Sequence, residues 1–135
     1  MNHQSEKKWN ISLWVLQILL AVLFGMGGLT KLTTPIDELS AQMSWVPLYS
    51  EEMVRFIGAA EVAGALGLIL PSALRILPVL SPIAALGLAT VMVLAARVHY
   101  TLGELPLISV NAVLASLALL IAWGRLKKAK ISPRA

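Results

Sequence analysis

The sequence contains no cysteine, and only 13% of its 135 residues are charged. Without cysteine, the chain by itself forms no disulfide, CxxC redox pair, thiolate metal site or iron–sulfur cluster. It has two histidines, and one of them, His3, lies in the polar amino-terminal tail, so no metal site is expected. It also lacks a phosphate-binding glycine loop, a GxSxG motif and an HExxH motif. These absences exclude self-contained soluble-enzyme chemistry, and no catalytic residue is assigned.

What the sequence has in excess is apolar residues, which make up 58% of the chain. A soluble domain is about half apolar and about a quarter charged. A helix needs about 20 mostly apolar residues to cross a bilayer. Four segments meet this requirement, at residues 11–30, 53–70, 76–96 and 107–123. The sequence therefore predicts an all-α integral membrane four-helix bundle, with residues 1–135 forming one transmembrane domain.

The positions of the basic residues predict how this bundle is oriented. Eight of the 11 lie before the first span, between the second and third, or after the fourth: Lys7, Lys8, Arg75, Arg125, Lys127, Lys128, Lys130 and Arg134. Cytoplasmic loops are enriched in lysine and arginine, so both termini are expected in the cytoplasm of a protein in the cell (inner) membrane. The net charge of +4 is then juxtamembrane. It indicates lipid headgroups, and no nucleic acid, as the partner.

The connections between spans contain further signals. In residues 31–52, Pro35 precedes a stretch, 36–43, whose apolar residues fall on one side of a helix. Proline is favoured at helix starts, so we expect two turns of interfacial helix over the outer mouth of the bundle. Residues 71–75 are expected to form a tight loop. Near the start of the third span, Pro78 and Pro82 predict either a kink or a helix that begins later than residue 76.

Four polar residues on the inward faces of the spans form the candidate site: Lys31, Glu61, His99 and Asn111. A charge at the centre of a span costs about 2.5–3.5 kcal/mol on insertion scales, so such residues are functional suspects. Each lies on the helix face that is rich in glycine and alanine, and such faces pack together in lipid. Each also lies towards the outer end of its span. The sequence therefore predicts a polar pocket in the outer half of the bundle, with glycine, alanine and leucine filling the rest of the interior.

Two alternatives stay open at these positions. His99 and Arg97 point to nearly opposite sides of a helix; we expect His99 to face inward and Arg97 to extend towards the outer headgroups. Glu61 either pairs with Lys31 or His99 and braces the bundle, or it binds a ligand, because a buried carboxylate must be paired, bound or protonated. Asn111 alone is typical of interhelical hydrogen bonding.

The residues around these positions resemble the DoxX-like family of small four-helix bacterial membrane proteins. The matching parts are Phe24–Leu32, Gly58–Gly64, Leu70-Pro71, Met92, His99 and Asn111, within roughly residues 11–124. The resemblance implies the four-helix fold and an association with membrane redox systems, such as a thiosulfate–quinone oxidoreductase subunit and oxidative-stress complexes. The characteristic Lys, Glu, His and Asn of the family coincide with the candidate site. Thiol chemistry of related proteins is not implied, because this chain has no cysteine.

These observations lead to three hypotheses. The first is an accessory or quinone-type-ligand-binding subunit of a membrane redox system, in which the four residues hydrogen-bond a polar head such as a quinone carbonyl. The second is a non-catalytic scaffold or assembly factor that contacts a membrane or redox protein through residues 35–49 and the basic tail. The third is a small-molecule or proton transporter. A quinone is the one cofactor considered, and the glycine and alanine faces leave a homodimer open.

Overall fold

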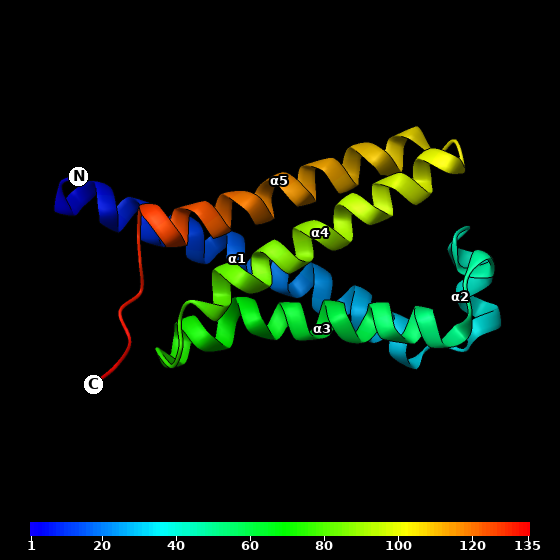
Figure 1. Cartoon of the computed structure of the whole chain (residues 1–135), viewed down its shortest axis with the longest axis horizontal. Coiled ribbons are helices and arrows are strands. Elements are labelled where there is room, and N and C mark those ends of the chain that lie inside the picture. The colour runs from blue at the N-terminus through cyan, green and yellow to red at the C-terminus, as the bar shows by residue number, and fades with distance from the viewer.

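The computed structural model describes all residues, 1–135, and its regular secondary structure is entirely helical. Its elements are α1 (His3–Thr33), α2 (Ile36–Gln42), the 3₁₀ helix η1 (Val46–Leu48), α3 (Glu51–Leu74), α4 (Leu80–Thr101) and α5 (Leu105–Lys127). The four long helices run along the long axis, with both chain termini at one end and α2 at the other (Figure 1). We call these ends the terminal end and the α2 end.

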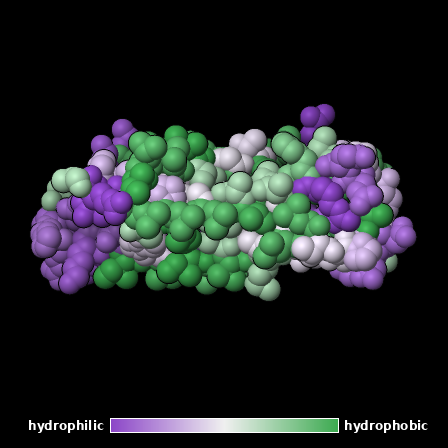
Figure 2. Space-filling view, turned by 90° about the horizontal axis from the view of Figure 1, so that it is seen from below, coloured by the Kyte–Doolittle hydropathy of each residue, from purple (hydrophilic) through white to green (hydrophobic).

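The four long helices are each long and apolar enough to cross a membrane. At about 1.5 Å per residue, even the shortest, α4, rises about 33 Å, which exceeds the hydrocarbon core of about 30 Å. On the face shown in Figure 2, apolar side chains form a belt across the middle of the molecule, with polar residues at both ends. Only 28 of 135 residues are buried, so most of the apolar belt faces outward, as lipid requires. The predicted all-α fold with four long apolar helices is confirmed.

Three of the long helices, α1, α3 and α5, extend beyond the predicted apolar runs at both ends, and α4 does so only at its carboxyl end. The amino-terminal helix begins at His3 because Asn2 caps it, its side-chain oxygen accepting a hydrogen bond from the Ser5 backbone N–H at 2.8 Å. The short helix predicted at residues 36–43 is confirmed as α2. It packs with η1 and the start of α3 in a small core of Leu39, Val46 and Val54.

The connection between α3 and α4 differs from the expectation. The prediction of a loop at residues 71–75 is wrong, because α3 continues through Pro71 to Leu74. Pro71 has no backbone N–H and so removes one hydrogen bond from the last part of the helix, which ends soon after it. The helix ends where Arg75 adopts a left-handed conformation, with φ of 56°. Of the two interpretations of Pro78 and Pro82, the later start is the one observed, since α4 begins at Leu80.

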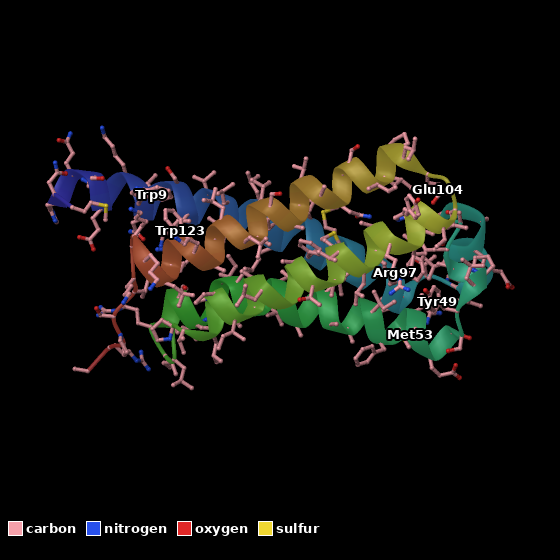
Figure 3. The ribbon with its side chains drawn as sticks, turned by 45° about the horizontal axis from the view of Figure 1, so that its top comes forward. Trp9, Tyr49, Met53, Arg97, Glu104 and Trp123 are labelled. Carbon is pink, nitrogen blue, oxygen red and sulfur yellow. The ribbon has the colours of Figure 1, made fainter.

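The bundle consists of two antiparallel pairs, α1 with α3 and α4 with α5, which join along α3–α4 and α1–α5. The main core includes Leu20, Phe24, Leu68, Leu88 and Ile121. At the terminal end, Trp9 and Trp123 pack edge to face with ring centroids 5.5 Å apart (Figure 3). From the α3–α4 connection, α4 diverges from α3 towards the α2 end (Figure 1).

Candidate functional site

Lys31 of α1 and Glu61 of α3 form an ion pair at the α2 end of the bundle. Lys31 Nζ lies 2.9 Å from Glu61 Oε2, and the two side chains are 12% and 6% exposed. The same Nζ also donates to the Gly27 carbonyl oxygen at 3.4 Å. Of the two partners that the sequence left open for Glu61, the structure selects Lys31. In a site of this burial, the carboxylate has a counter-charge, and the pair as a whole is neutral.

Two glycines bring the backbones of α1 and α3 close enough for this pair. A β-carbon at Gly28 would lie 2.6 Å from the Gly58 carbonyl oxygen. A β-carbon at Gly58 would lie 2.8 Å from both the Gly28 carbonyl oxygen and Lys31 Cβ. Only glycine fits at such a crossing, and small residues serve this purpose between membrane helices. The crossing places Lys31 one turn after Gly28, opposite the helical turn between Gly58 and Glu61.

His99 faces inward near the end of α4, and Arg97 is exposed, as expected. The partner of His99 is a residue that sequence reasoning missed: its Nδ1 lies 2.6 Å from Oε2 of Glu104, which precedes α5. The other carboxylate oxygen of Glu104 accepts a hydrogen bond of 2.5 Å from the Ser44 hydroxyl. These two bonds, with that of Ser44 the stronger influence, lower the pKa of Glu104 below its ordinary value. Glu104 thus connects the α2–η1 segment to the α4–α5 turn.

Asn111 of α5 is 8% exposed, and its Nδ2 is buried without a hydrogen-bond partner. Buried polar groups in proteins nearly always have a partner. Leaving a buried donor unpaired costs about 1–3 kcal/mol. An interhelical hydrogen bond by this group, one of the uses expected for an asparagine in a span, is absent. The Asn111 amide therefore has a donor that the chain itself does not use.

All four candidate residues line one cavity of about 660 Å³. Its walls come from α1, α3, α4 and α5 together with Trp45 and Tyr49, and 11 of its 17 lining residues are hydrophobic. The structure therefore brings Lys31, Glu61, His99 and Asn111 to the same space. It does not join them in one network, because the Lys31–Glu61 pair, the His99–Glu104 pair and the Asn111 amide make separate contacts. Arg97 lies on the rim of this cavity.

A second polar cluster lies at the terminal end, where the sequence predicts an interior of glycine, alanine and leucine. That prediction is wrong. Arg125 is 4% exposed. Its Nε donates to Gln17 Oε1 at 2.6 Å, and its Nη1 donates to Asn10 Oδ1 at 2.6 Å and to the Ala129 carbonyl oxygen. Gln17 in turn donates to the Leu68 carbonyl oxygen. These hydrogen bonds join α1 to α5 and to α3.

The sequence contains a signal for this cluster. In α5 the inward residues follow one stripe with spacings of four and three: Asn111, Ala115, Ala118, Ala122 and Arg125. Residues at such spacings share a helix face, so Arg125 continues the buried face. Its position among the basic residues after the fourth span explains why the charge pattern alone assigned it to the surface.

The chemistry available to a ligand in the cavity is hydrogen bonding. No group of three or more His, Asp or Glu side chains in the chain is placed to hold a metal ion. The Asn111 amide and the second ring nitrogen of His99 have no partner within the chain. The Lys31–Glu61 pair adds a charged donor and a charged acceptor. Apolar walls with a few placed polar groups are typical of small-molecule sites.

The comparisons with known proteins give one result. The profile of the DoxX-like family matches residues 15–121, a range that reaches from α1 to α5 and includes all four candidate residues. No curated protein and no solved structure matched the chain. Since the family match extends over well more than half of the sequence, and the four apolar helices agree with it, this chain is a membrane protein that belongs to the DoxX-like family.

Proposed function

We propose that the chain binds a lipid-soluble ligand with a compact polar head, of the quinone type, in the cavity at the α2 end. In this proposal it serves as an accessory subunit of a membrane redox system. The observation that supports it most directly is the Asn111 amide, which is buried, unpaired and at the back of a cavity with mostly apolar walls. A carbonyl oxygen of the ligand would accept from this amide.

The remaining polar groups fit the same kind of head. Lys31 and Glu61 offer a donor and an acceptor across from the α4 wall, and the free ring nitrogen of His99 is a further partner. The head would be held by hydrogen bonds, and the apolar chain would contact aliphatic side chains. His99 is also hydrogen-bonded to Glu104, which extends this set of polar groups towards the surface at the α2 end.

Binding can be tested in lipid nanodiscs. We expect native mass spectrometry to detect a co-purified quinone-type molecule and a short-chain quinone to raise the thermal stability of the protein. Asn111→Leu should lower the quinone affinity about tenfold or more, a difference of about 1.4 kcal/mol. The matched control is Ser116→Ala on the same helix, since Ser116 is exposed and donates only to the Ala112 carbonyl oxygen. Absence of both bound molecule and thermal shift in native lipid would contradict the proposal.

We also propose that the terminal end faces the cytoplasm of a bacterial inner membrane. The support is the excess of lysine and arginine at this end. The cysteine-free sequence allows a direct test with a membrane-impermeant thiol reagent. In intact cells, a cysteine at Glu38 in α2 should be labelled and one at Ala135 should not, although both positions are exposed in the fold. The opposite labelling would reverse the orientation.

The scaffold function remains a second candidate because apolar side chains are exposed at the α2 end. Leu48 is 57% exposed and Tyr49 42% exposed. A partner protein would cover these side chains. If a protein co-purifies with both the parent chain and Asn111→Leu, but is lost with Leu48→Ser, the scaffold hypothesis is favoured over ligand binding.

A further inference from the structure

The cavity has two facing apolar walls that come from α3 and α4. The α3 wall consists of Met53, Phe56, Ile57 and Ala60, and the α4 wall of Val91, Leu94, Ala95 and Val98. Both sets follow the spacing i, i+3, i+4, i+7, so each is a single helix face. Of the polar site residues, Lys31 lies on α1, Glu61 on the inner side of α3 and Asn111 on α5, at the back of the cavity, and His99 lies near the end of α4.

These walls remain exposed at their outer edges. Phe56 is 68% exposed, Leu94 58% and Met53 43%, whereas Glu61 and Asn111 at the back are 5% and 8% exposed. The cavity is therefore open between α3 and α4, along what we call the α3–α4 seam. This open side lies at the level of the spans.

The seam is closed in the other half of the bundle. Near the α3–α4 connection, the Ser72 hydroxyl donates to that of Ser81 at 2.7 Å. Further along, Leu88 of α4 packs against Gly64 of α3. A β-carbon at Gly64 would lie 2.5 Å from Leu88 Cδ2. Towards the α2 end, α4 diverges from α3 (Figure 1). The opening is thus confined to the half of the membrane near the α2 end.

The end of the bundle above the cavity is covered. Ser44, in the connection between α2 and η1, is joined to Glu104, and Glu104 to His99. Trp45 and Tyr49, which lie beside η1, add aromatic side chains to the lining on this side. A ligand that approaches from water therefore encounters this hydrogen-bonded connection, whereas a ligand that approaches from lipid reaches the open, apolar α3–α4 seam.

We propose that the ligand enters this cavity sideways, from the lipid, through the α3–α4 seam, and that its apolar chain lies between Phe56 and Leu94 when bound. This inference rests on the proposed function and adds a ligand class to it, namely an amphipath with a long chain. Pockets for drug-sized molecules have volumes of about 300–1,000 Å³, and this one has about 660 Å³. It accommodates a head and the first part of a chain, and the rest of a long chain extends into lipid.

Arg97 is the polar residue at the lip of the seam. It is exposed, makes no ion pair or hydrogen bond within the chain, and lies on α4 near Tyr49 and Met53 (Figure 3). A guanidinium at this position donates to an oxygen-bearing head before that head passes between the apolar walls. Arg97 therefore acts as a positioning residue for entry, and it selects molecules whose heads contain hydrogen-bond acceptors.

The first test blocks the seam with thiol labels, which the cysteine-free sequence makes specific. Phe56→Cys and Leu94→Cys are each labelled with a bulky maleimide in nanodiscs, and binding of a long-chain quinone is measured. We expect a loss of affinity of about tenfold or more in both. The matched control is labelled Val93→Cys, which is 60% exposed on α4 but does not line the cavity. Unchanged binding in both labelled seam variants would overturn the lateral route.

A second measurement does not depend on any ligand. A nitroxide attached at Ala60→Cys, inside the cavity, should be more accessible to oxygen, which concentrates in lipid, than to a water-soluble nickel complex. Greater accessibility to the nickel complex would overturn lateral entry. If the nitroxide reports lipid access but the parent chain binds neither long-chain nor short-chain quinone, then the quinone proposal fails and the lateral opening stands.

Discussion

Lys31 Nζ and Glu61 Oε2 lie 2.9 Å apart between α1 and α3, and they form the only ion pair in the bundle that joins two spans. Removal of one partner from a buried pair costs about 3–5 kcal/mol, because the other charge stays buried without compensation. We therefore expect Glu61→Gln and Lys31→Met each to destabilise the protein strongly in thermal unfolding in nanodiscs.

The double variant Lys31→Met/Glu61→Met separates bracing from binding. Replacement of a buried pair by apolar residues of similar size is often neutral or stabilising, so we expect the double variant to unfold close to the parent temperature. If it is as unstable as the single variants, the pair braces the bundle in its own right. If it is stable but no longer binds quinone, the pair is retained for the ligand.

Asn111 should show opposite effects on stability and binding. Its Nδ2 is buried and unpaired in the ligand-free chain, and Asn111→Leu removes this polar group while keeping a similar volume. We expect the ligand-free variant to gain about 1–3 kcal/mol of stability. The same substitution should lower quinone affinity. Lower stability of ligand-free Asn111→Leu would show that the amide has a partner within the bundle.

The Glu104 connection predicts a dependence on pH. The pKa of Glu104 in the folded chain is lowered from 4.5 by its bonds to Ser44 and His99. A carboxyl with a lowered folded-state pKa stabilises the fold above pH 4.5, and the contribution decreases as the pH falls through the folded-state value. We expect the parent chain to exceed Glu104→Gln in thermal stability above pH 4.5, and the difference to shrink in more acidic buffer. A difference that is constant with pH would contradict the assignment.

The cluster at the terminal end predicts a loss of stability without a loss of binding. Gln17→Leu removes the acceptor of Arg125 Nε and the donor to the Leu68 carbonyl oxygen. Each buried group left unpaired costs about 1–3 kcal/mol, so thermal stability should fall clearly. The cavity lies at the opposite end of the bundle, and quinone affinity at a temperature where the variant is folded should match that of the parent chain.

Length and hydropathy were sufficient to predict the four spans, since lipid imposes a run of apolar residues on each one. Helical spacing was sufficient to predict the inward faces of Lys31, Glu61 and Asn111, because small residues mark the packed side. The partner of Glu61 depends on the distance between α1 and α3, which spacing within one helix does not contain. The role of Glu104 depends on how two connections meet in space. The sequence pattern placed Arg125 at the surface, because a basic residue near the end of a span contributes the same charge whether its side chain points outward or into the bundle.

The crossing of Gly28 and Gly58 predicts that a single methyl group will disturb the site. In Gly58→Ala the new β-carbon would lie 2.8 Å from the Gly28 carbonyl oxygen and from Lys31 Cβ. The Gly28 carbonyl oxygen is part of the helix backbone and cannot rotate out of contact as a side chain can. The helices α1 and α3 must therefore separate where Lys31 is positioned against Glu61. We expect lower thermal stability together with weaker quinone binding.

Gly87→Ala in α4 is the matched control for this substitution. No atom lies within 4 Å of a β-carbon at Gly87, so the methyl group meets open space on the lipid side. In a helix interior, alanine is favoured over glycine by about 0.5–1 kcal/mol, so this variant should unfold at a slightly higher temperature and bind quinone as the parent chain does. If Gly58→Ala behaved like Gly87→Ala, the close approach of α1 and α3 would not be what holds Lys31 beside Glu61. Opposite signs for the same chemical change would assign the effect of Gly58 to the helix crossing, since the intrinsic helix preference is shared by both positions.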